Sequence, residues 1–136
     1  MQNRTSITRI ILTLVLFTCA MTMCFISANA AEPRYVGVSY VSADLEITSG
    51  GRATCNGSCG TRPGYSVDVV MELQQESGST WTTIKTWSGE GSEVILEKNI
   101  YVVKGHNYRV MVSADVYNGS GNIVDSLTTY SNLKAY

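Results

Sequence analysis

The sequence predicts an all-β protein, folded as a seven-stranded antiparallel β-sandwich, and three observations lead to that prediction. Residues 65–73 and 108–116 place apolar side chains at alternate positions, which is the period of a strand with one buried face. Turn-forming Gly, Ser and Asn residues recur about every ten residues along the chain. No segment after residue 30 shows the period of an amphipathic helix. Many short strands joined by short turns are typical of two antiparallel sheets packed face to face.

Each expected strand has a local reason. In the first, Leu45 and Ile47 alternate with acidic residues, and in the second, small residues share one face. Turns at residues 48–51, 75–79, 88–91 and 118–122 separate the strands, and the last of these is the strongest hairpin signal in the chain. A longer loop rich in Gly, Ser and Pro is expected at residues 56–64. The expected strands are residues 36–47, 52–55, 65–73, 81–87, 93–103, 108–116 and 123–130.

The first thirty residues have the order of a secretory signal peptide. Arg4 and Arg9 form a positive start, residues 10–26 are almost wholly apolar, and small residues end the segment at positions 28–30. We therefore expect a signal peptide at residues 1–30, cleavage before Ala31, and a secreted protein whose one domain is residues 31–136. The alternative is a membrane anchor, but residues 10–26 are fewer than the about 20 that a spanning helix needs. After cleavage, no segment is long and apolar enough to span a membrane.

The mature part has a composition that excludes some partners. Residues 31–136 keep eight of the ten basic residues and all eleven acidic ones, which gives a formal net charge of −3. These charges are scattered singly, with no basic patch, so we expect no nucleic-acid partner. The 106 residues that remain are enough for one domain with a hydrophobic core.

Cys55 and Cys59 remain after cleavage, and an even pair in an exported protein suggests a disulfide. On a straight strand these residues would be roughly 13 Å apart, whereas a disulfide needs Cα atoms within about 7 Å. The intervening Asn-Gly pair is a tight-turn signal, so we favour a local disulfide around a turn at Gly57. The alternative is two free thiols, with Cys55 packed inward and Cys59 in a loop. Two thiols and the distant His106 do not supply four metal ligands, and we expect neither a metal nor a cofactor.

Residues 103–112 contain a corner followed by an alternating strand, with Gly105 in the corner and Tyr108 at the start of the strand. This arrangement resembles the corner and sixth strand of immunoglobulin-like and fibronectin type III domains, where such a Tyr hydrogen-bonds back to the corner backbone. The resemblance implies an immunoglobulin-like sandwich and a structural role for Gly105 and Tyr108. Neither the inter-sheet disulfide of antibody domains nor the second-strand Trp of fibronectin type III domains is present.

Several short stretches are similar to small exported proteins of unknown function from Gram-positive bacteria. This resemblance implies a shared domain and an extracellular location in such a bacterium, and it implies no activity. The stretches that resemble that family are residues 51–55, 73–75, 81–87, 105–110 and 129–131.

The sequence offers no catalytic set. His106 is a lone histidine in a turn, and no nucleophile elbow accompanies it. Glu90, Glu93 and Glu97 are close in sequence, but acids on exposed strands normally keep a protein soluble. We therefore expect a non-enzymatic protein with no catalytic residues.

The strand at residues 81–87 is the strongest candidate binding surface. At a period of two, Trp81, Thr83, Lys85 and Trp87 share one face, and a Lys between two Trp is unusual for a core. If that face is exposed, the two indoles lie about 20 Å apart and can stack on sugar rings or on a partner's surface. The alternative is that one or both Trp fill the sandwich, with a β-bulge changing the parity.

These observations predict a secreted, non-enzymatic binding or interaction module. The expected partner is an extracellular protein or a cell-wall glycan. A second hypothesis is a secreted inhibitor or antagonist that acts through loops at one end, including residues 56–64. A third hypothesis, a small extracellular hydrolase, lacks a nucleophile–base pair.

Overall fold

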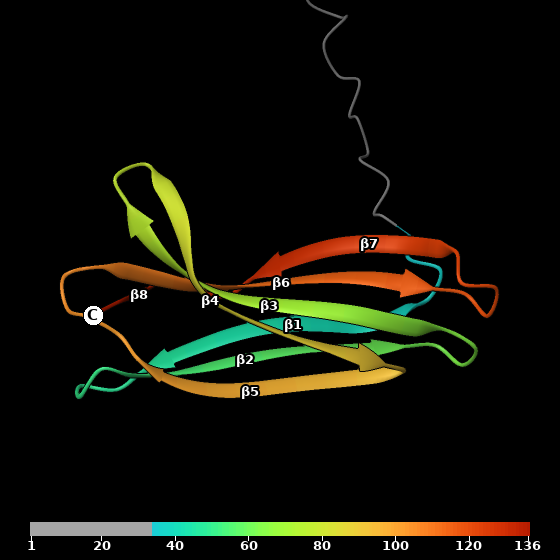
Figure 1. Ribbon diagram of the computed structural model, residues 1–136, viewed down its shortest axis with the longest axis horizontal. Helices are drawn as coiled ribbons and strands as arrows, with labels where there is room; N and C mark the ends of the chain where they lie inside the picture. Colours follow the sequence, from blue (N-terminus) through green and yellow to red (C-terminus); the bar gives the residue numbers. More distant parts are fainter. Residues whose placement is uncertain (1–33) are drawn as a thin grey trace, which may run out of the picture. The chain divides into compact units, whose positions relative to one another are not determined.

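A computed structural model describes residues 34–136 of the chain, and Figure 1 shows the arrangement of its strands. The expected signal peptide at residues 1–30 and the cleavage site before Ala31 lie outside the described residues. The strands are β1 (Val38–Ile47), β2 (Arg52–Thr61), β3 (Ser66–Ser77), β4 (Thr80–Gly91), β5 (Glu93–Tyr101), β6 (Asn107–Tyr117), β7 (Ile123–Tyr130) and the short β8 (Lys134–Ala135).

The strands form two antiparallel sheets that pack on each other. One sheet has three strands in the order β1-β2-β5, and the other has the order β4-β3-β6-β7, with β8 paired to one end of β6. The predicted all-β sandwich with seven main strands is therefore confirmed, and the division of the strands is immunoglobulin-like. Among residues 34–136, no helix is long and apolar enough to cross a membrane.

The hydrophobic core lies between the sheets and is built from alternate residues of the central strands. β3 buries its odd-numbered positions and β6 its even-numbered ones, as their period-two patterns predict. Each Val or Leu buried in this way contributes about 1.5–3 kcal/mol relative to an exposed side chain. The largest fully buried side chains are Leu45, Cys55, Cys59, Val67, Val69, Met71, Leu73, Tyr108, Val110, Val112 and Val116.

The predicted turn and disulfide at Gly57 are wrong. β2 continues through Gly57 to Thr61, and it is paired on one side with β1 and on the other with β5. Because the chain stays extended, Cys55 and Cys59 point into the core from separate positions, and both thiols are free. Burial raises the pKa of the Cys55 thiol to about 11 and also raises the pKa of the Cys59 thiol. The expected loop at residues 56–64 therefore begins only after Thr61.

Small residues on the inner face of β2 let the two sheets approach closely. Gly57 lies between the two cysteines on this face, and a Cβ there would lie 2.8 Å from Cγ2 of Val112 in the opposite sheet. The space that a larger second-strand residue would fill is thus occupied by side chains of β3 and β6.

The corner before β6 has the hydrogen bond that the sequence predicts. The Tyr108 side chain is fully buried, and its hydroxyl donates to the Val103 carbonyl at 2.7 Å. The same hydroxyl accepts a hydrogen bond from the Val103 N–H at 3.2 Å. Gly105, within the corner, has a φ of 90°, which favours glycine over other residues.

The start of β1 is attached to β7 through one carboxylate. Asp125 accepts hydrogen bonds from the backbone N–H groups of Val36, Gly37 and Val38, at 3.1, 2.7 and 3.3 Å. Burial alone would raise the pKa of Asp125, but these three donors and the positive charge of Arg62 lower the pKa overall. The ionised carboxylate therefore stabilises the junction between the two sheets at this edge.

Candidate functional site

A β-bulge in β4 interrupts the strand that contains the expected binding surface. Leu73 of β3 pairs with Lys85, but the next residue, Gln74, pairs with Thr83, so Ile84 is an extra residue in β4. A bulge reverses the alternation of side chains beyond it and increases the local twist. Figure 1 shows the β3–β4 hairpin curling away from the rest of the sheet towards its tip.

The four residues of the expected surface consequently divide into two pairs. Trp87 pairs with the buried Met71 and is half-buried against the core, and Lys85 is on the same side of the sheet but exposed. Trp81 and Thr83 lie on the opposite, outer face. The prediction that all four share one face is therefore wrong, because the bulge changes the parity between the two pairs. The alternative, in which one Trp packs into the sandwich and a β-bulge changes the parity, is correct for Trp87.

Trp81 belongs to a cluster of side chains on the outer face of the β4-β3-β6-β7 sheet. The guanidinium Cζ of Arg109 lies 4.2 Å from the ring centroid of Trp81 and 4.3 Å from that of Tyr130. Gln74 accepts a hydrogen bond from Arg109 Nε at 2.9 Å. We call Gln74, Trp81, Arg109 and Tyr130 the stacked-arginine site.

Four adjacent strands supply one residue each to this site. The two central strands, β3 and β6, contribute Gln74 and Arg109, which are direct partners in the register. The flanking strands β4 and β7 contribute Trp81 and Tyr130, one row to either side of the Gln74–Arg109 row. Tyr130 is a diagonal neighbour of Arg109 on the adjacent strand, whereas Trp81 reaches Arg109 across β3. The two rings therefore lie on opposite sides of the guanidinium along the strand direction.

The Gln74 amide is buried and fully hydrogen-bonded, which fixes its orientation. Only 7% of Gln74 is exposed. Its Nε2 donates to Glu72 Oε2 at 3.0 Å and to Thr83 Oγ1 at 3.4 Å, while Thr83 Oγ1 donates to Glu72 Oε2 at 2.6 Å. With Nε2 held in this way, the amide oxygen faces Arg109 and defines the direction of the guanidinium.

Arg109 has unused donors at its outer edge. Among residues 34–136, only Nε of the guanidinium finds an acceptor, and no carboxylate oxygen lies within 4.0 Å of its nitrogens. Glu72 is connected to Arg109 only through the Gln74 amide. Each cation–π contact contributes about 0.5–1 kcal/mol at an exposed site. The cluster is therefore a fixed positive group, with ring walls, that can bind an anionic or hydrogen-bond-accepting group.

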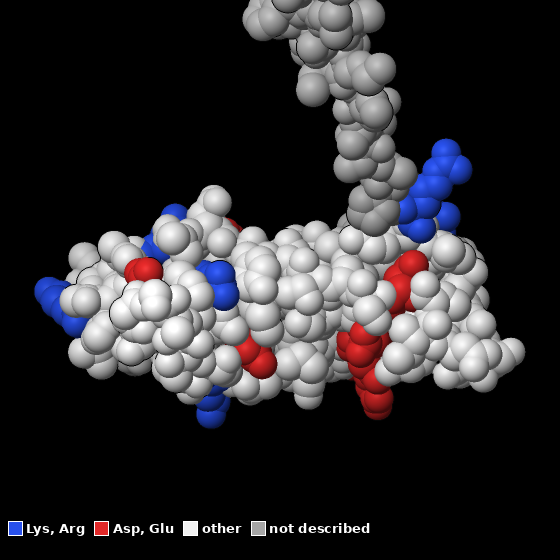
Figure 2. All heavy atoms as spheres, turned by 90° about the horizontal axis from the view of Figure 1, so that it is seen from above, with Lys and Arg blue, Asp and Glu red and all other residues white. Residues whose placement is uncertain are grey.

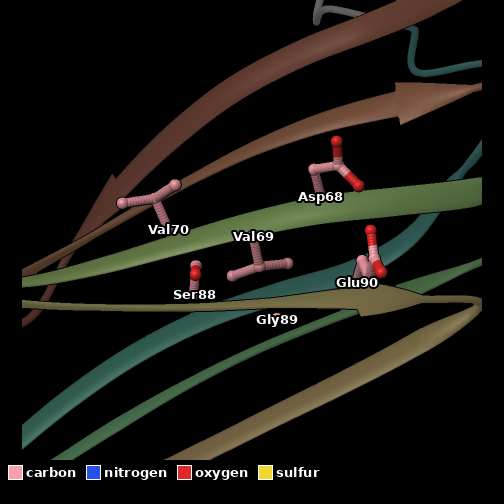
Figure 3. Close-up of a pocket in the computed structure, with 6 residues that line it drawn as sticks. All are labelled: Asp68, Val69, Val70, Ser88, Gly89 and Glu90. Atoms are coloured by element: carbon pink, nitrogen blue, oxygen red, sulfur yellow. The ribbon is translucent and has the colours of Figure 1, made fainter.

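The opposite end of the same face is acidic. Glu90, Asp68 and Asp115 are neighbours in the register of β4, β3 and β6, and Figure 2 shows a column of acidic side chains on the face that it presents. Figure 3 shows Asp68 and Glu90 on the same side of β3 and β4, beside a depression between the two strands. Gln74 is six positions further along β3, which is roughly 20 Å away. The depression is thus separate from the stacked-arginine site.

The residues considered for catalysis do not come together. Glu90 is on the outer face of one sheet, whereas Glu93 and Glu97 are on the outer face of the other. His106 lies in the corner, with its ring centroid 6.3 Å from that of the buried Tyr108. Within the described part of the chain, no group of three or more His, Cys, Asp or Glu residues could hold a metal ion.

Three members of the stacked-arginine site were not predicted from the sequence. Arg109 and Tyr130 occupy outer positions of expected strands, whereas Gln74 lies one residue beyond the expected end of its strand, because β3 continues to Ser77. The signal available was a large basic residue, Arg109, at an outer position of an alternating strand. Alternation gives the face of a residue, but only the register between strands shows which outer side chains meet.

Comparisons with known proteins assign neither a family nor a function to the chain. No family model matches the chain, and no curated protein matches it. The solved structures that match include the solution structure of CsgH from R. palustris, which is 16% identical with a TM-score of 0.37. That match covers 70% of this chain and 92% of the CsgH chain. Similarity at this level supports no conclusion about function.

Proposed function

We propose that this chain is an exported, non-enzymatic binding module that contacts its partner through the stacked-arginine site. The observation that supports the proposal is the state of Arg109. Two rings and Gln74 hold its guanidinium in place, yet no carboxylate pairs with it among the residues that the structure describes. A side chain that is already fixed loses little freedom when a ligand binds, so such a group favours recognition.

The partner that we propose is a cell-wall glycan or another extracellular protein of a Gram-positive bacterium. Export, cleavage before Ala31 and the bacterial source are parts of this proposal, and they rest on residues 1–30 and on the sequence resemblance. Tyr130 is 49% exposed, so part of its ring is open to solvent beside the Arg109 donors. Aromatic surface next to fixed polar donors suits both sugar rings and protein surfaces.

The antagonist hypothesis keeps only a short part of the loop first expected. Residues 56–60 belong to β2 and are paired with a strand on each side, so only residues 62–65 form a loop at that end of the sandwich. We therefore prefer the outer face of β4-β3-β6-β7 to the end loops as the contact surface.

A retention assay tests the proposed surface. The purified mature protein would be incubated with cell-wall material and, separately, with immobilised proteins from the culture supernatant. Trp81→Ala and Tyr130→Ala should each weaken retention, because each removes one wall of the Arg109 stack and a contact of about 0.5–1 kcal/mol.

Tyr101→Ala is the matched control, since Tyr101 is 75% exposed on the outer face of the other sheet. It should leave retention unchanged. Equal retention of the two site variants and the wild-type protein, or an equal loss in Tyr101→Ala, would contradict the proposed surface.

A further inference from the structure

We infer that the stacked-arginine site recognises a single carboxylate group, held in a bidentate contact by the Nη donors of Arg109. The inference rests on the proposed function and adds the chemistry of the ligand to it. It follows from the direction in which the guanidinium is open, from the buried group that sets this direction, and from the charges around it.

The free donors of the Arg109 guanidinium are at its Nη end. Trp81 and Tyr130 contact the guanidinium from opposite sides along the strand direction, and its Nε–H is used by Gln74. What remains is the edge with the two Nη nitrogens, whose donors have no acceptor among residues 34–136. A planar pair of parallel N–H groups matches the two oxygens of a carboxylate. The rings on either side reduce the access of water to the guanidinium, which strengthens a charge-assisted contact at its Nη end.

The buried Gln74 keeps Arg109 in this direction. If Arg109 turned away, the Gln74 amide oxygen would lose its hydrogen-bond partner at a position that is 7% exposed. Leaving a buried acceptor unpaired is unfavourable, so the open edge is present before a ligand arrives. Glu72 does not take the place of the ligand, because neither of its carboxylate oxygens lies within 4.0 Å of an Arg109 nitrogen, and its Oε2 accepts from Gln74 and Thr83.

The surrounding charges favour one carboxylate over a polyanion. Glu72 is one row from Arg109 on the same face, and Glu76 on the other side accepts a hydrogen bond from Asn107 at 2.6 Å. Further along the face lies the acidic row that contains Asp68. A phosphate or sulfate polymer would bring several negative charges close to these acidic groups and be repelled. An isolated carboxylate brings a single negative charge, which the unpaired Arg109 can balance.

The carboxylate can come from the end of a peptide or from an acidic sugar, and small probes separate these sources. The mature protein would be labelled with ¹⁵N and titrated with N-acetylglycine or with galacturonate, and followed through the Arg109 Nε–H and Trp81 indole N–H signals. The neutral counterparts are N-acetylglycinamide and the methyl ester of galacturonate. We expect a saturable shift of both signals with at least one acid and none with its neutral counterpart.

Variants then test the geometry of the contact. Arg109→Lys keeps the charge but removes the planar fork, and it should weaken binding of the effective acid about tenfold or more. Arg52→Lys is the matched control, because Arg52 is an exposed arginine on the outer face of the other sheet. It should leave the affinity unchanged. The comparison of acid and neutral probe on the wild-type protein decides the matter even if Arg109→Lys does not fold.

Three results would overturn the inference: no shift with either acid, equal shifts with acid and neutral probe, or a larger affinity for inorganic phosphate than for the acids. Undiminished binding of the acid by folded Arg109→Lys would overturn it too. Failure of the inference and failure of the proposed function are distinguishable. If Trp81→Ala lowers retention on the partner while neither acid shifts the signals, the proposed binding surface is supported and the proposed carboxylate ligand is refuted.

Discussion

Replacing Gly57 with alanine should destabilise the sandwich, because the two sheets meet at this residue. A Cβ at this position would lie 2.8 Å from Cγ2 of Val112 and 2.9 Å from Sδ of Met71. Both neighbours are fully buried in the opposite sheet. The Met71 side chain is flexible, but Val112 is β-branched and has little rotamer freedom, so the contact can be relieved only by moving the sheets or the strand.

The expected size of this effect follows from two opposing contributions. An extra methyl group in a packed core costs about 1–3 kcal/mol, and alanine in place of glycine offsets about 0.4–1 kcal/mol by restricting the unfolded chain. We expect a net loss of about 1–2 kcal/mol in the free energy of unfolding. For a domain of this size, that loss lowers the melting temperature by roughly 4–16 °C.

Thermal unfolding followed by circular dichroism measures the effect, with Gly119→Ala as the matched control. Gly119 lies in the turn between β6 and β7, has no positive φ and has no atom within 4 Å of an added Cβ. Its replacement should change the stability by less than about 0.5 kcal/mol. Equal melting temperatures for Gly57→Ala and Gly119→Ala would refute the close approach of the sheets. In a double-mutant cycle, Val112→Ala should partly compensate Gly57→Ala, since it removes the atom that the new Cβ meets.

Three further predictions concern other parts of the sandwich. Tyr108→Phe should cost about 1–3 kcal/mol, because both backbone polar groups of Val103 lose their partner in the corner, and a thermal melt without loss of stability would contradict this role. Cys55 and Cys59 should be inert to Ellman's reagent in the folded protein and should react as two thiols after unfolding without reductant. If no thiol reacted after unfolding, the two cysteines would have to be bonded in a disulfide. Because the pKa of Asp125 is lowered in the folded state, its contribution to stability should be present above its unfolded pKa of about 3.9 and be lost as the pH falls through the lower folded pKa. Asp125→Asn should therefore flatten the acid limb of a stability–pH curve, and an identical limb in wild type and variant would count against a stabilising role of the Asp125 carboxylate.

The strand pattern was predictable because alternation is a local property, and β3 and β6 show why. Their buried faces follow the period of two, and the sequence separates them with strong turn signals. The same local reasoning failed at Gly57. Glycine marks both tight turns and places where another backbone or side chain approaches closely, and its local sequence does not distinguish the two. Here β1 and β5 pair with β2 on both sides of Gly57, so the strand continues.

The candidate site was predictable only in part, because it depends on one extra residue and on register. With an unbroken period, Trp81 would lie on the same side of β4 as Trp87, which faces the core. The extra residue Ile84 moves Trp81 to the outer face, and the register of β3, β6 and β7 then brings Arg109 and Tyr130 to it. The composition and the apolar pattern of residues 81–87 do not reveal this bulge. Only the pairing of β4 with β3 shows it. The same bulge separates the two roles that the sequence had assigned to one face. One Trp stabilises the core, and the other completes a surface that orients an arginine towards solvent.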